Sequence, residues 1–176
     1  MVQPLPNRFI PAEFLTTGHY IFGQLKVIQS GLMGMLSDTT TSYLEMNDAS
    51  VAYIHKPSSI TNYAPILYTV RSQVVVVGLS KREYVGLQGV MRGGFHRMVP
   101  YPVQITTAMY DIACTLEWSG RLEFSALMSE GTSAFIMVYN AVLYAPLFPA
   151  LHIESPVMLV NRNYVDTLTV MKKAEI

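Results

Sequence analysis

The feature that most constrains the fold is an internal repeat, because the chain aligns with itself at an offset of about 91 residues. The matching residues keep the same order and nearly constant spacing over most of the chain. Matched pairs are Pro11 with Pro102, Ile21 with Ile112, Leu25 with Leu116, Pro65 with Pro156, Arg71 with Arg162 and Val74 with Val165. A repeat of this kind predicts one structural unit that is built twice.

Each copy contains the same sequence of patterns, rich in β-branched and aromatic residues that favour strands. A glycine and a short segment with helical spacing interrupt the strands in both copies. The expected elements are first strands His19–Ile28 and Val103–Trp118, short helices 32–36 and 122–128, second strands Tyr43–Ile54 and Ala134–Tyr144, and closing hairpins within Ile66–Leu79 and Val157–Val170.

The repeat divides the chain into a first β-rich unit at 1–80, a Gly- and Arg-containing linker at 81–101 and a second β-rich unit at 102–176. A copy of about 65 residues is marginally stable alone, so we expect the two to pack as one compact unit. The predicted fold class is mostly β (β-rich α+β), with each copy a small twisted sheet or partly open barrel that carries one short helix.

Composition narrows the function classes. Of the 176 residues, 51% are hydrophobic and only 14% charged, with a formal net charge of zero. These values exclude intrinsic disorder and argue against a nucleic acid as partner. The chain also holds 11 Met and 11 Tyr, which either fill the core or form an apolar patch at an interface.

The longest apolar stretch runs from Phe135 to Ile153, but Pro146 and Pro149 interrupt it. Two prolines three residues apart would break a membrane-spanning helix. The N-terminus also lacks the basic and apolar regions of a secretory signal. We therefore expect a cytoplasmic protein without a membrane span.

Each copy resembles a small, functionally uncharacterised bacterial domain family whose pattern is a Gly-x-Leu strand, a Leu-Ser-Asp helix, an Asp-Ala strand end and a Leu-Val-Asn hairpin. The residues that carry the resemblance are Gly23-Gln24-Leu25, Leu36-Ser37-Asp38 and Asp48-Ala49 in the first copy, and Leu127-Met128-Ser129-Glu130, Asn140-Ala141 and Leu159-Val160-Asn161-Arg162 in the second. The second copy departs from the pattern at Cys114 and Asn140. The family implies a tandem duplication and no activity.

The sequence offers no catalytic or metal-binding constellation. The four histidines have no metal-ligand spacing. The single cysteine, Cys114, lies in a predicted strand at the position that Gly23 has in the first copy, and we expect it to be a small buried thiol. Asp38 and Glu130 follow the two short helices, where turn formation is the expected role of a carboxylate. We therefore expect no enzyme, no metal and no cofactor.

Candidate binding residues are the arginines of the two predicted turns, Arg71 and Arg162, together with Arg92, His96 and Arg97 of the linker. An arginine in a turn can grip a phosphate or a carboxylate with its fork of N–H donors. The alternative is that these charges are simply solvated.

These observations favour a non-catalytic structural or interaction module that assembles with itself or with a protein partner. The alternative is a small ligand- or RNA-binding barrel that uses Arg71 and Arg162. An aromatic platform of Trp118, Tyr101 and Phe95 would suit single-stranded nucleic acid, although the neutral charge argues against it.

Overall fold

The computed structural model describes residues 8–86, 97–129 and 133–171 of the chain. Its elements are strands β1 Arg8–Leu15, β2 His19–Val27, β3 Tyr43–Tyr53, β4 Ile60–Val70, β5 Val76–Leu79, β6 Met98–Thr107, β7 Asp111–Ser119, β8 Phe135–Tyr144, β9 His152–Asn161 and β10 Val165–Val170; helices α1 Gly31–Ser37 and α3 Phe124–Ser129; and 3-10 turns η1 Arg71–Gln73, η2 Arg82–Val85 and η3 Arg162–Tyr164.

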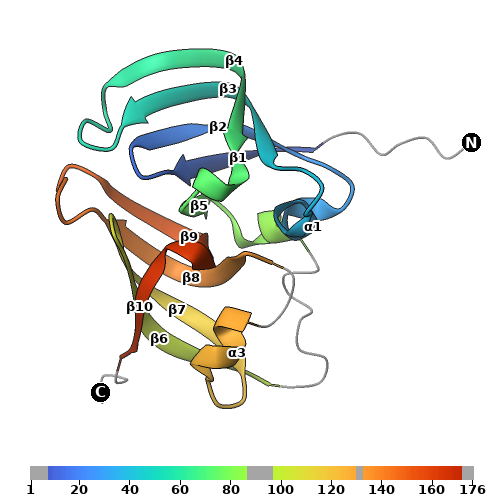
Figure 1. Cartoon of the computed structure of the whole chain (residues 1–176), viewed down its shortest axis with the longest axis vertical. Helices are drawn as coiled ribbons and strands as arrows, with labels where there is room; N and C mark the ends of the chain where they lie inside the picture. The colour runs from blue at the N-terminus through green and yellow to red at the C-terminus, as the bar shows by residue number, and fades with distance from the viewer. Residues whose placement is uncertain (1–7, 87–96, 130–132, 172–176) are drawn as a thin grey trace, which may run out of the picture.

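All these strands join one antiparallel sheet, in the order β10-β6-β7-β8-β9-β5-β1-β2-β3-β4 (Figure 1). The mostly β fold class is thereby confirmed. The sheet is not closed, so β4 and β10 form its two free edges. Among the described residues, no helix is long and apolar enough to cross a membrane.

Each half of the sheet is strongly curved, because a short connection containing a 3-10 turn joins strands at its opposite edges. In the first half, η1 and the two residues after it, Val74 and Val75, connect β4 to β5, although β1, β2 and β3 lie between these strands in the sheet. Four spacings in a flat sheet would separate these strands by about 19 Å. A 3-10 turn of three residues advances about 6 Å, and two further extended residues add about 7 Å, which is still less than the flat-sheet separation. The sheet must therefore curl until the two edges approach at that end. Turn η3 connects β9 to β10 in the same way.

The two halves follow the same element order and pair their strands in corresponding registers. Tyr43 faces Val70 across β3 and β4, and Phe135 faces Asn161 across β8 and β9. The pairing of β2 with β3 shifts by one residue at Asp48, and the pairing of β7 with β8 shifts by one residue at Asn140; both residues have positive φ. Asp and Asn tolerate this left-handed conformation better than most residues. The duplication itself stays a prediction.

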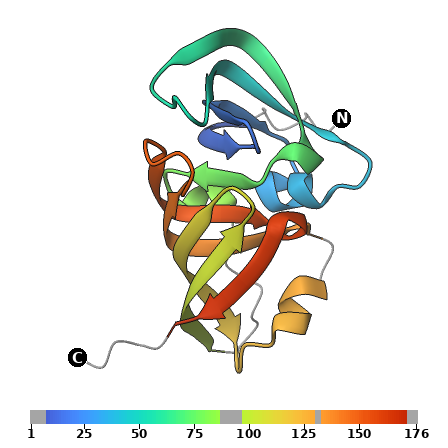
Figure 2. The same ribbon diagram turned by 60° about the vertical axis from the view of Figure 1, so that its left-hand side comes forward.

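The halves join where β9 pairs with β5, over Val76–Leu79 and Val157–Val160 (Figure 2). The buried Asn161 strengthens this junction, since its backbone N–H donates to Val75 O at 2.8 Å and its Nδ2 donates to Val74 O at 2.9 Å. Two apolar cores flank the sheet, and residues of β5 and β9 contribute to both of them.

Several expectations about the elements are wrong. The segments β4–β5 and β9–β10 are not hairpins, because the strands on either side of η1 and η3 lie at opposite edges of a half. The predicted strand Val103–Trp118 is in fact two paired strands, β6 and β7. Strand β6 begins at Met98 and η2 occupies 82–85, so parts of the predicted linker 81–101 are regular structure.

Candidate interaction surface

Arg71, the first candidate binding residue, has a structural role at the end of α1. Its Nη1 donates to the backbone oxygens of Asp38 and, at 3.4 Å, of Met35 and Leu36. These carbonyl groups lie at the helix C-terminus, where a cation is favourable. The guanidinium therefore fastens η1 to α1.

Of the other candidate residues, the structure describes only Arg162 and Arg97. Arg162 is half-buried in η3, and Arg97 is exposed just before β6. Arg92 and His96 lie outside the described residues. The turns η1 and η3 do lie together, because the Tyr164 hydroxyl donates to Ser72 O at 2.9 Å.

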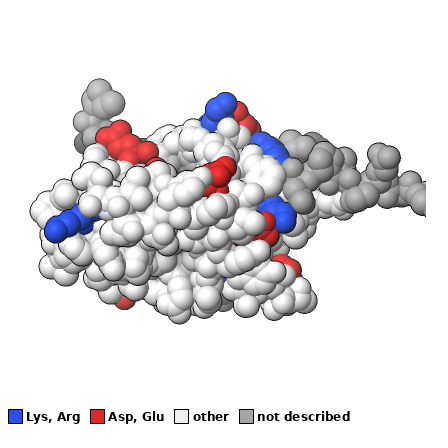
Figure 3. Space-filling model, turned by 90° about the horizontal axis from the view of Figure 1, so that it is seen from above, with Lys and Arg blue, Asp and Glu red and all other residues white. Residues whose placement is uncertain are grey.

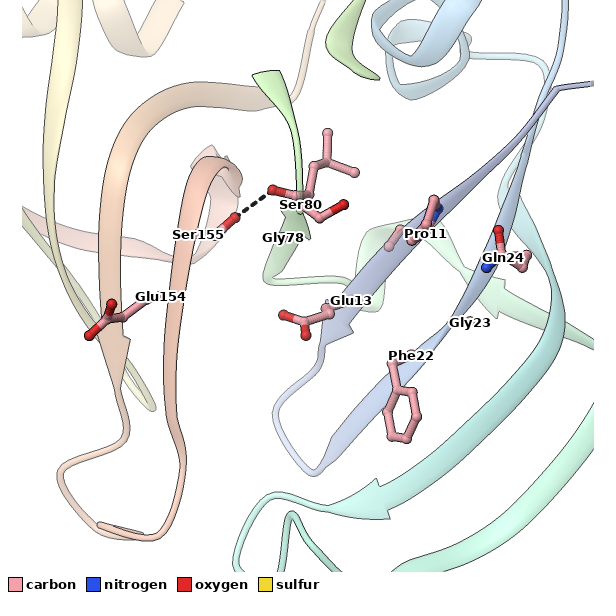
Figure 4. A pocket seen from close by; sticks show the side chains of 11 residues that line it. Pro11, Glu13, Phe22, Gly23, Gln24, Gly78, Ser80, Glu154 and Ser155 are labelled. Carbon is pink, nitrogen blue, oxygen red and sulfur yellow. Dashed lines mark hydrogen bonds between the residues drawn. The ribbon is translucent and has the colours of Figure 1, made fainter. Parts of the chain in front are cut away.

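A hollow of about 310 Å³ lies among β1, β2, β5 and β9 (Figure 4). Two of its polar side chains, Glu13 and Ser155, already have partners within the chain. Glu13 accepts a hydrogen bond of 2.8 Å from the Tyr20 hydroxyl, and the Ser155 hydroxyl lies 2.8 Å from Leu79 O. The Glu154 side chain points away from Glu13 (Figure 4). The hollow therefore lacks a pair of converging carboxylates.

The remaining reactive groups also serve the structure. Cys114 is buried, as expected, and burial raises the pKa of its thiol to about 12. Asp38 accepts hydrogen bonds from the Thr40 N–H at 2.8 Å and the Thr40 hydroxyl at 2.6 Å, which lower the pKa of its carboxyl. The described residues contain no group of three or more His, Cys, Asp or Glu that could hold a metal ion.

The two described members of the predicted aromatic platform do not form an exposed surface. Tyr101 and Trp118 are partly buried against the core of the second half, and the Tyr101 hydroxyl donates to Gly120 O at 2.6 Å. Phe95, the third member, lies outside the described residues.

The most unusual surface is the outer side of β3 and β4, where large apolar side chains are exposed. We call Tyr43, Ile66, Tyr68 and Val70 the β4 apolar face; each is about half exposed or more, and Tyr68 is 61% exposed. The Tyr43 and Tyr68 rings meet edge to face with centroids 5.3 Å apart. Seen from above, most of the visible surface is uncharged, and the Lys, Arg, Asp and Glu side chains lie in separate small groups (Figure 3).

The candidate residues predicted from the sequence do not include this face, although the sequence carries a signal for it. Ile66, Tyr68 and Val70 alternate with Leu67 and Thr69, as expected for a strand that is apolar on both sides. Only the side that carries Leu67 packs against the core, and the side that carries Ile66, Tyr68 and Val70 is exposed.

No protein-family model, curated protein or solved structure matches this chain significantly. The expected resemblance to a bacterial domain family thus stays a prediction, and the case for a function rests on the surface itself.

Proposed function

We propose that this chain is a non-catalytic structural or interaction module, built from a duplicated β unit, that binds a protein through β4 and its apolar face. The observation that supports the proposal best is the exposure of Ile66, Tyr68 and Val70 on a free edge strand. Contiguous exposed apolar surface is typical of protein contact sites, and tyrosine is enriched in them.

The edge strand itself supports the same conclusion. Monomeric proteins usually protect an edge strand with charged residues, prolines or bulges, because its free N–H and C=O groups can pair with another chain. Strand β4 is 11 residues long and contains no Lys, Arg, Asp or Glu. Its one proline, Pro65, and its one register shift, near Thr61, both lie before the apolar segment 66–70 and leave that segment able to pair.

The alternative, a ligand- or RNA-binding barrel that uses the two turn arginines, has less support. The Arg71 guanidinium is held by carbonyl oxygens at the end of α1. A phosphate would have to compete with those hydrogen bonds. We therefore rank protein binding above it.

The test is affinity purification of the tagged chain from the cells that naturally contain it, together with light scattering on the purified protein. The variant Ile66→Thr/Tyr68→Thr removes the apolar groups and keeps residues that favour strands. Tyr144→Thr is the matched control, because Tyr144 is also exposed in a strand but lies outside the β4 apolar face.

We expect wild type and the control to retain the same protein, either another protein or untagged copies of the chain, and the double variant to lose it. Equal retention by all three, or a wild type that is monomeric and retains no protein, would overturn the proposal.

A further inference from the structure

The sheet already contains one example of how its free edges can join. At the internal junction, β9, an edge strand of the second curved half, pairs with β5, an edge strand of the first. By order within their halves, β4 corresponds to β9 and β10 corresponds to β5. One free edge, β4, therefore corresponds to the β9 side of the junction, and the other, β10, corresponds to the β5 side (Figures 1 and 2).

We infer that β4 of one chain pairs antiparallel with β10 of a second copy, so that identical chains assemble head to tail. The inference rests on the proposed function, because it names the partner that β4 binds. It uses the internal junction as its template.

The template also gives a register. At the internal junction Val157 faces Leu79, Leu159 faces Val77 and Val160 faces Val76. The offset of about 91 residues transfers these pairs to the free edges. The expected pairs between copies are Ile66 with Val170, Leu67 with Thr169, Tyr68 with Leu168, and Thr69 with Thr167.

The backbone directions agree with this register. Arg71 N–H donates to Ser42 O on the β3 side, so by alternation the N–H groups of Tyr68 and Val70 face outward. Met171 N–H donates to Pro102 O on the β6 side, so the N–H groups of Leu168 and Val170 face outward as well. Tyr68 and Leu168 can therefore exchange a pair of backbone hydrogen bonds.

The burial of corresponding residues gives independent support. Tyr43, Ile66 and Tyr68 correspond by strand register to Phe135, Val157 and Leu159 of the second half. The latter three are at most 2% exposed and belong to the core that the first half supplies. Their counterparts on β3 and β4 are the exposed apolar face, which lacks an equivalent cover in a single chain.

The β10 side of the second half shows the complementary pattern. In the alignment of the two copies that pairs Leu36 with Met128, Phe124 corresponds to Leu32. Phe124 is 50% exposed, whereas Leu32 is 1% exposed. Val170 is likewise exposed, whereas its counterpart Leu79 is buried. The end of the molecule that carries β10 therefore also exposes apolar groups that the internal junction would bury.

One polar group on the edge also fits. The buried Thr69 hydroxyl has no hydrogen-bond partner among the described residues. In the proposed register it lies opposite Thr167 of the next copy. The Thr167 hydroxyl is already bonded to the Thr106 hydroxyl of its own chain, but a hydroxyl can take part in more than one hydrogen bond, and threonine pairs across strands commonly form them.

A contact between two different edges is heterologous, so it closes into a ring when the rotation allows and otherwise extends as a filament. Two variants isolate the edges. Tyr68→Pro removes an outward N–H from β4, and Val170→Pro removes one from β10, in each case away from the neighbouring strand of the same chain. Val170→Thr, which keeps the N–H, is the control.

Light scattering is performed on each protein alone and on a 1:1 mixture of the two proline variants, after circular dichroism has shown that both are folded. We expect wild type and Val170→Thr to assemble, each proline variant to remain a monomer, and the mixture to form a species with the mass of two chains. That species cannot grow, since both of its remaining edges are blocked.

If Val170→Pro assembles like wild type, or if the mixture remains monomeric, head-to-tail pairing is refuted. A wild type that is monomeric but binds a different protein through the β4 apolar face would also refute it, and would leave the proposed function standing.

A cysteine pair tests the register even if a proline variant does not fold. Leu67 and Thr169 form a non-hydrogen-bonded pair in the proposed register, the closer type in antiparallel sheets and one that suits a disulfide. Leu67→Cys/Thr169→Cys should form covalent multimers on oxidation, whereas the out-of-register pair Tyr63→Cys/Thr169→Cys should not. Equal cross-linking of both pairs, or of neither, contradicts the register.

Discussion

Removing the Asn161 side chain should destabilise the protein through the junction between its halves. The Asn161 Nδ2 donates to Val74 O at 2.9 Å, and its Oδ1 accepts from Asn163 N–H at 3.1 Å. Both Asn161 and Val74 are buried, so water cannot replace the first bond, whereas Asn163 is exposed and water can replace the second. Leaving a buried acceptor unsatisfied costs about 1–3 kcal/mol, and a typical hydrogen bond contributes about 1 kcal/mol. We therefore expect Asn161→Ala to lower the free energy of unfolding by about 2–3 kcal/mol.

The measurement is urea unfolding at one fixed protein concentration, because assembly would add to the apparent stability. Asn163→Ala is the matched control, since it removes an exposed amide next to the same turn and keeps the backbone N–H that Asn161 accepts from. It should change the free energy of unfolding by less than about 0.5 kcal/mol. Equal effects of the two substitutions would refute the assignment of the stabilisation to the buried Asn161–Val74 bond.

Four further predictions concern three buried or crowded positions. Tyr110→Phe should cost about 1–3 kcal/mol, because the fully buried Tyr110 hydroxyl donates to Thr16 O across the two halves; an unchanged urea midpoint would contradict this. Burial also raises the pKa of the Tyr110 hydroxyl above its ordinary value of 10.0, so the stability of wild type should fall as the pH rises above 10.0. Tyr110→Phe should lose less stability than wild type over the same pH range. Parallel curves of unfolding free energy against pH would exclude this contribution. Gly23→Ala should lower the free energy of unfolding by about 1–3 kcal/mol, since a Cβ at this position would lie 2.8 Å from Asn47 O. The control Gly18→Ala should be nearly neutral, because a Cβ there would meet no atom within 4 Å. Similar melting temperatures for the two variants would be inconsistent with this crowding. Cys114 should react with a thiol reagent only after denaturation, because burial raises its pKa to about 12; rapid labelling of the native protein at neutral pH would disprove it.

Local elements were predictable where the chain carries a strong local pattern. Tyr43–Ile54 and Ala134–Tyr144 were predicted as strands and correspond to β3 and β8, because their β-branched and aromatic residues alternate. The short helix after Gly31 is also confirmed. Strand β1 had too weak a signal, since it contains Pro11 and Glu13. The proline is tolerated because β5 pairs only with the part of β1 that begins at Ala12.

The pairing of the strands was not predictable from local patterns. A three-residue turn between two apolar strands has the same sequence signature whether the strands form a hairpin or close a curved sheet. What separates β4 from β5 is the pairing of β5 with β1 and β9, which are distant from it in sequence. The candidate site was missed for the same reason, because Tyr68 was placed in a hairpin rather than on a free edge.

The strand topology also distinguishes between two ways in which identical chains could meet. Two copies of β4 could pair with each other around a twofold axis, which would satisfy their backbone groups. Such a contact would only extend the sheet, and it would bring no core against Ile66 and Tyr68. Pairing with β10 brings the second half of another chain, with Phe124 and Val170, to the place that the first half occupies over Val157 and Leu159. Because burial of apolar area is the main source of affinity at such contacts, the mixed edge is favoured over the symmetric one.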